Sequence, residues 1–86
     1  MNITDVRVRT VNTESNLKAV ASITIDDAFV VHDIKLIQGE HGFFIGMPSR
    51  KDEIRGFRDV AHPITTEARN QISELIISEY EKVLSE

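Results

Sequence analysis

The sequence predicts an α+β fold, in which an antiparallel meander of four to five strands is followed by one C-terminal helix. Between residues 3 and 47, four segments show the two-residue alternation or the β-branched content of strands, and short polar clusters separate them. After Pro63, apolar residues recur at helical spacing. Because the strand-like segments all precede the helical one and hairpin-length turns join them, an antiparallel meander is the simplest topology.

The first two predicted strands cover residues 3–11 and 17–25, with a polar turn between them. The first is expected to be half-buried, because uncharged and charged residues alternate along it. Its uncharged face contains Thr4, Val6, Val8 and Thr10, and its charged face contains Asp5, Arg7 and Arg9. The second has an apolar face formed by Leu17, Ala19, Ala21, Ile23 and Ile25. One face of each strand is therefore expected to pack on the core.

The third predicted strand, residues 28–37, is apolar on both sides at its start and is expected to be central. Strict alternation places Ala28, Val30, His32, Ile34 and Leu36 on one face, and Phe29, Val31, Asp33, Lys35 and Ile37 on the other. A turn with two glycines leads into the fourth strand, residues 43–47. Residues 48–58 are predicted to form a loop because Pro48 and Gly56 interrupt it, and Phe57 to Ala61 are a candidate fifth strand.

The predicted helix begins after Pro63, with Thr65 or Thr66 as its N-cap and Glu67 in the first turn. Its apolar stripe is expected to contain Ala68, Ile72, Leu75, Ile76 and Val83, and to be widened by Ile77, Tyr80 and Leu84. One helix does not cover both faces of a four-stranded sheet. The apolar residues left over predict a homodimer.

Length and composition indicate one domain, residues 1–86, with a small core. Hydrophobic residues make up 41% of the chain and charged residues 28%, which is typical of an ordinary globular protein. The chain has no cysteine, so disulfides, thiolate metal sites and a cysteine nucleophile are excluded. Its apolar runs are too short to span a bilayer and its start has no signal segment, so a cytoplasmic setting without membrane contact is expected.

Residue types that carry catalysis are scattered in this chain. His32, His41 and His62 match no metal-ligand spacing, and Asp26-Asp27 is explained by turn formation. The four glycines form neither a phosphate-binding loop nor a dinucleotide fingerprint. We therefore expect no enzyme activity, metal, cofactor or small-molecule substrate.

The one positive signal is a basic segment, residues 50–58, which has a net charge of +2 in a chain whose net charge is −4. It contains Arg50, Lys51, Arg55 and Arg58, four of the ten basic residues. From the residues alone, a phosphate-binding loop and a solvated surface loop both remain open. Arg7 and Arg9 either extend this basic patch or are simply exposed strand positions.

Five motifs together resemble one known family. They are residues 3–7 (ITDVR), 21–26 (ASITID), 29–34 (FVVHDI), 47–49 (MPS) and 56–64 (GFRDVAHPI). The chain resembles the stage V sporulation protein G family (SpoVG), also called septation proteins, over most of its length. The family often has a proline after its basic run, whereas residues 49–54 (SRKDEI) contain none.

The resemblance implies a small bacterial cytoplasmic regulator that binds DNA, and in some members RNA, and influences septation, sporulation or virulence genes. It also implies a dimer built on a shared sheet, with the helix packed against the partner. The family's basic positions after Met-Pro-Ser fall on Arg50 and Lys51, and its later arginine falls on Arg58. We add Arg55 on charge alone, and Thr66 and Arg69 because the start of a helix offers contacts to phosphate. The alternative is a protein-interaction module in cell division or regulation that acts through the apolar helix face and the acidic surface without touching nucleic acid.

Overall fold

The structure, a computed structural model, describes residues 1–12 and 14–85 and confirms the α+β class. Its elements, in chain order, are β1 (Ile3–Thr10), β2 (Leu17–Ile25), β3 (Phe29–Gly39), β4 (Gly42–Gly46), β5 (Ser49–Asp52), β6 (Gly56–Asp59) and α1 (Thr66–Ser85). The first four strands form one antiparallel sheet in the order β1-β2-β3-β4, so the predicted meander and the central position of the third strand are confirmed. In the described part of the chain, no helix is both long and apolar enough to cross a membrane.

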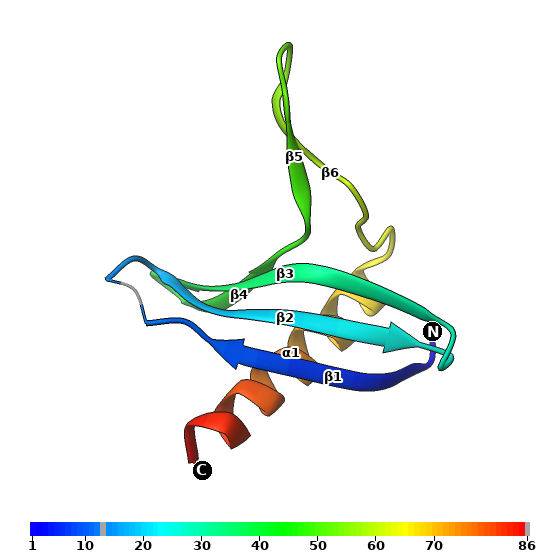
Figure 1. Cartoon of the computed structure of the whole chain (residues 1–86), viewed down its shortest axis with the longest axis vertical. Coiled ribbons are helices and arrows are strands. Elements are labelled where there is room, and N and C mark those ends of the chain that lie inside the picture. Colours follow the sequence, from blue (N-terminus) through cyan, green and yellow to red (C-terminus); the bar gives the residue numbers. More distant parts are fainter. Residues whose placement is uncertain (13, 86) are drawn as a thin grey trace.

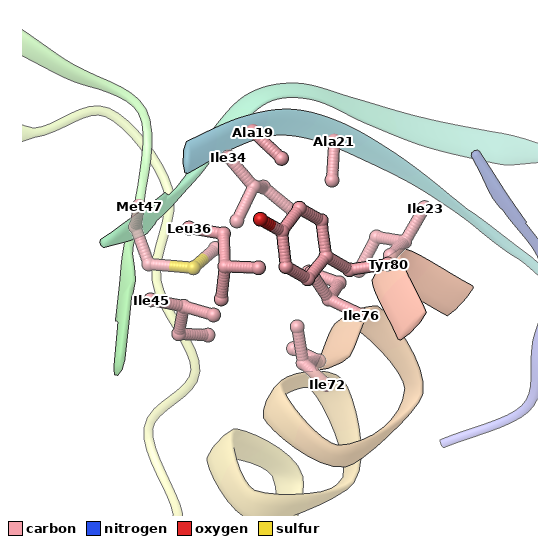
Figure 2. Packing of buried hydrophobic residues seen from close by; sticks show 10 residues of the cluster. All are labelled: Ala19, Ala21, Ile23, Ile34, Leu36, Ile45, Met47, Ile72, Ile76 and Tyr80. Carbon is pink, nitrogen blue, oxygen red and sulfur yellow. The ribbon is translucent and has the colours of Figure 1, made fainter. Parts of the chain in front are cut away.

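The hydrophobic core lies between the four-stranded sheet and α1, which packs across one face of it (Figure 1). Three residues of β2 pack against Ile72, Ile76 and Tyr80 of the helix (Figure 2). They are Ala19, Ala21 and Ile23. The complete buried set is Ala19, Ala21, Ile23, Ile34, Leu36, Ile45, Met47, Ile72, Ile76 and Tyr80. Small residues at the centre of β2 leave room for the Tyr80 ring (Figure 2).

The helix begins as predicted, and its predicted stripe is confirmed at Ile72 and Ile76 but is wrong at Leu75. Thr65 is the N-cap, because the Ala68 N–H donates to its Oγ1 at 3.1 Å. Tyr80, expected only to widen the stripe, is 8% exposed, whereas Leu75, expected within it, is 37% exposed. The Tyr80 ring packs edge-on against Phe43 with centroids 5.5 Å apart, and this contact with β4 helps set which side of the helix faces the sheet.

The predicted faces of the third strand are wrong at its start, because β3 contains a bulge. Ile23 pairs with Val31, but Ala21, two residues earlier, pairs with Ile34, so β3 has one extra residue in this interval. Asp33 adopts a left-handed conformation there, with φ of 63°. The bulge reverses the alternation, so Val31 packs on the core together with Ile34, while Ala28, Val30 and His32 are exposed.

The predicted loop at residues 48–58 is also wrong, because it contains a second sheet, the hairpin β5–β6. The hairpin projects from the four-stranded sheet as an arm (Figure 1). Its turn is stabilised by the Ile54 N–H, which donates to Asp52 Oδ1 at 2.9 Å, and by Gly56, whose φ is 84°. At its base, the Val60 N–H donates to the Pro48 carbonyl at 2.7 Å. The candidate fifth strand thus begins one residue earlier than expected and ends at Asp59.

Candidate nucleic-acid interface

The hairpin β5–β6 carries the four basic residues singled out in the sequence. Its register places Arg50 opposite Arg58 and Lys51 opposite Phe57. Because side chains alternate along a strand, these two pairs lie on opposite faces of the hairpin. We call the face with Arg50, Asp52 and Arg58 the arginine face, and the face with Lys51 and Phe57 the phenylalanine face.

Two guanidinium groups share the arginine face with one carboxylate. Asp52 Oδ2 lies 3.9 Å from Arg58 Nη1, at the limit of an ion pair. The other carboxylate oxygen, Oδ1, accepts the Ile54 N–H. Arg50 has no ion pair within the described residues. Two guanidinium groups thus share one carboxylate, so this face retains unneutralised positive charge. Like charges directly opposite each other also destabilise a strand pair, by about 0.2–1 kcal/mol.

The phenylalanine face places an aromatic ring beside a cation. The Phe57 side chain is 75% exposed, and Lys51 is exposed next to it. Since the Val60 N–H bonds to Pro48, the alternation of an antiparallel ladder makes Lys51 and Phe57 a non-hydrogen-bonded pair, the kind with the closer side chains. Across residues 1–12 and 14–85, Lys51 forms no ion pair.

Arg55 lies at the tip of the hairpin, in the turn with Glu53 and Ile54. All three turn residues are exposed, and Ile54 is 91% exposed. The structure therefore brings the four predicted basic residues onto one arm. It divides them between the arginine face, the phenylalanine face and the tip, so they do not form one continuous patch.

The predicted helix residues, Thr66 and Arg69, lie on a different element. Thr66 is the first residue of α1 and is exposed. The Arg69 side chain donates from Nη2 to the Ile45 carbonyl at 3.3 Å, so it ties the helix to β4. This tether uses one of its guanidinium nitrogens, while the Thr65 cap already occupies the Ala68 N–H at the start of the helix. Their role in binding stays a prediction.

A further basic surface lies on the open face, by which we mean the sheet face opposite α1. There Arg9 pairs with Val20, and Val20 pairs with Lys35, so the two cations lie in one row across three strands. Arg7, on the same face of β1, is paired with Asp5 at 2.9 Å. Sequence reasoning named Arg7 and Arg9 but missed Lys35, although its place between the core residues of β3 was the signal that it points outward.

The open face adjoins the base of the hairpin. Lys35 and Ser49 line one groove, whose walls also include Val20, Val30 and Val60. Within the described part of the chain, no group of three or more His, Cys, Asp or Glu residues is placed to hold a metal ion. The groove thus combines the cation of Lys35 with apolar side chains and with His32 and Asp33.

Comparison with known proteins shows the family to which this chain belongs. The family model described as SpoVG matches residues 1–82. A protein of Clostridium perfringens named "Putative septation protein SpoVG" is 57% identical over 83 residues, which cover 96% of this chain and 92% of the relative. Proteins of the same name from Lachnospira eligens (57% identical; 95% and 93% covered) and Caldanaerobacter subterraneus subsp. tengcongensis (56%; 95% and 90%) are similar. The resemblance drawn from the sequence motifs is confirmed.

Proposed function

Because the chain belongs to the SpoVG family and carries a basic hairpin, we propose that it is a small nucleic-acid-binding regulator whose β5–β6 arm contacts phosphates. The ligand is DNA or RNA, and the protein acts in the cytoplasm. The name of its relatives refers to septation, and we extend this to a role in septation, sporulation or gene expression.

The observation that carries the proposal is the cross-strand pair Arg50–Arg58. Two guanidinium groups held opposite each other raise the free energy of the isolated hairpin, and a bound phosphate relieves that repulsion. Arg55 at the tip and Lys51 on the other face give the arm positive charge on three sides. A projecting arm also brings these cations within a Debye length of a backbone, about 8 Å at physiological salt, while the acidic body stays farther away.

We propose further that the protein acts as a homodimer. Large apolar side chains remain exposed at the base of the hairpin, including Phe29, which is 66% exposed, and Val30 and Val60. A core of ten buried residues is small, and covering this apolar surface with a second copy would add to it. Two arms held by one dimer would contact two sites on the same nucleic acid.

The test is a salt titration of binding, measured by fluorescence anisotropy with labelled DNA and RNA. Arg50→Gln combined with Arg58→Gln should lower the affinity and reduce the slope of log K against log salt by about 0.9 for each duplex phosphate that the protein no longer neutralises. Lys82→Gln, which removes an exposed cation near the end of α1, is the matched control and should change little. Binding that is indifferent to salt, or to the double substitution, would contradict the proposal.

A protein-interaction module is the second candidate. It is favoured by a shallow groove on α1 that combines Ile77 with Glu74, Glu81 and Lys82, and by the exposed Leu84 near the helix end. In this case the hairpin substitutions would be silent. Substitution of Leu84 by Ser would abolish partner capture, and treatment with nuclease would leave capture unchanged.

A further inference from the structure

Phe57 is an exposed aromatic residue on the hairpin, away from the hydrophobic core. A single exposed apolar side chain is ordinary on a protein surface and needs no explanation by itself. What sets Phe57 apart is its neighbour across the ladder, since Lys51 lies directly opposite it on the same face of the hairpin. The other exposed phenylalanines, Phe29 and Phe44, lie on the four-stranded sheet, outside the arm.

An aromatic ring beside a cation matches the chemistry of an unpaired nucleotide. The base stacks on the ring, and the phosphate next to it meets the cation. In a duplex the flat faces of the bases are already stacked on each other, so an exposed ring on the protein has nothing to cover. The arginine face lacks an aromatic residue and offers only charge, which serves paired and unpaired strands alike.

We propose that Phe57 is a stacking platform for an unpaired base and that Lys51 binds a phosphate of the same strand. This inference rests on the proposed function and deepens it, because it makes single-stranded DNA or RNA the preferred ligand over a duplex. The turn supports this assignment. Asp52 and Gly56 fix the hairpin geometry through the Ile54 N–H bond and a left-handed φ, so the ring and the ammonium group stay on one face.

The test compares three labelled probes by fluorescence anisotropy: oligo-dT and oligo-U of about 12 nucleotides, and a DNA duplex of the same length. Phe57→Ala should weaken binding of the single-stranded probes by about 5- to 100-fold, the usual range for removal of one stacked base. Binding of the duplex should change by less than about 2-fold. Phe57→Tyr should keep the preference, and Ile54→Ala, which removes another exposed apolar side chain of the hairpin, is the matched control.

A second readout reports stacking directly. The chain contains no tryptophan, so Phe57→Trp introduces a single tryptophan at the proposed platform, which can be excited selectively over Tyr80. Its emission should be quenched by oligo-dT or oligo-U and should stay unchanged with the duplex. The two single-stranded probes also distinguish DNA from RNA as the source of the base.

Several outcomes would overturn the inference, and they differ from those that would overturn the proposed function. If Phe57→Ala weakens all three probes equally, or none of them, the ring does not stack on a base. If it changes the mass of the protein in light scattering, Phe57 is a contact between copies of the chain. If Arg50→Gln with Arg58→Gln abolishes binding while Phe57→Ala is silent, the proposed function stands without this inference. Failure of the unmodified protein to bind any probe would reject the proposed function itself.

Discussion

Arg50 and Arg58 lie directly opposite each other across the β5–β6 ladder, and Asp52 is the one carboxylate in the described chain that reaches either of them. The two guanidinium groups repel each other in the isolated protein, and together they offer several N–H donors to a phosphate. Sites that bind anions often retain such repulsion, because the same charges that repel each other attract the ligand.

Arg50→Thr should stabilise the hairpin and weaken nucleic-acid binding at the same time. Removing one of two facing cations relieves about 0.2–1 kcal/mol of repulsion, and threonine suits a strand. The measurement is amide hydrogen exchange of the hairpin at low salt, alongside anisotropy. Lys51→Thr is the control, because Lys51 faces Phe57 rather than a cation and its removal should not slow exchange. Faster exchange in Arg50→Thr would show that the two arginines do not repel each other.

Asp52→Asn should strengthen binding at low salt by up to about 5-fold, because it removes the negative charge nearest Arg58. The asparagine oxygen still accepts the Ile54 N–H, so the turn is kept. Asp52→Ala removes the charge and the acceptor together, and should raise amide exchange at the tip. If Asp52→Asn binds more weakly than the unmodified protein, the carboxylate positions Arg58 for the ligand instead of competing with it.

Gly56→Ala should weaken binding by disordering the hairpin, with the core unaffected. No neighbouring atom lies within 4 Å of an added Cβ, so the cost comes from the φ of 84° alone and is about 1–2 kcal/mol. Gly42→Ala is a matched control, since Gly42 has a φ of 121° and equally open surroundings but is the first residue of β4, outside the hairpin β5–β6. Fluorescence anisotropy should show weaker nucleic-acid binding for Gly56→Ala than for Gly42→Ala. An equal decrease of binding in both would mean that hairpin order is not what matters.

Ile76→Ala should destabilise the fold by about 2–5 kcal/mol, because this side chain is fully buried between helix and sheet. Leu75→Ala, one residue earlier and partly exposed, should cost less than about 1 kcal/mol. Urea unfolding followed by circular dichroism measures both. A cost at Leu75 as large as that at Ile76 would mean that Leu75 is buried within the stripe, as expected from the sequence.

Local sequence patterns predicted those parts of the fold that depend on neighbouring residues in the chain alone. The alternation in residues 17–25 identified the buried face of β2, and the pair Thr65-Thr66 marked the start of α1, where Thr65 is the N-cap. The same alternation failed in β3, because a bulge at Asp33 inserts one residue and exchanges the two faces. Nothing in a two-residue period reports such an insertion, since it depends on pairing with β2.

For the candidate site too, some features were predictable from the sequence and others depended on strand pairing. The sequence by itself determined the α+β class, the antiparallel meander, the family and the concentration of positive charge in residues 50–58. Only the tertiary structure decided that this segment is a hairpin, that Arg50 faces Arg58, and that Lys51 lies beside Phe57 on the opposite face. The physical reason is register. Which side chains become neighbours across a ladder depends on where the turn closes, and here the Asp52–Ile54 hydrogen bond and the left-handed Gly56 close it.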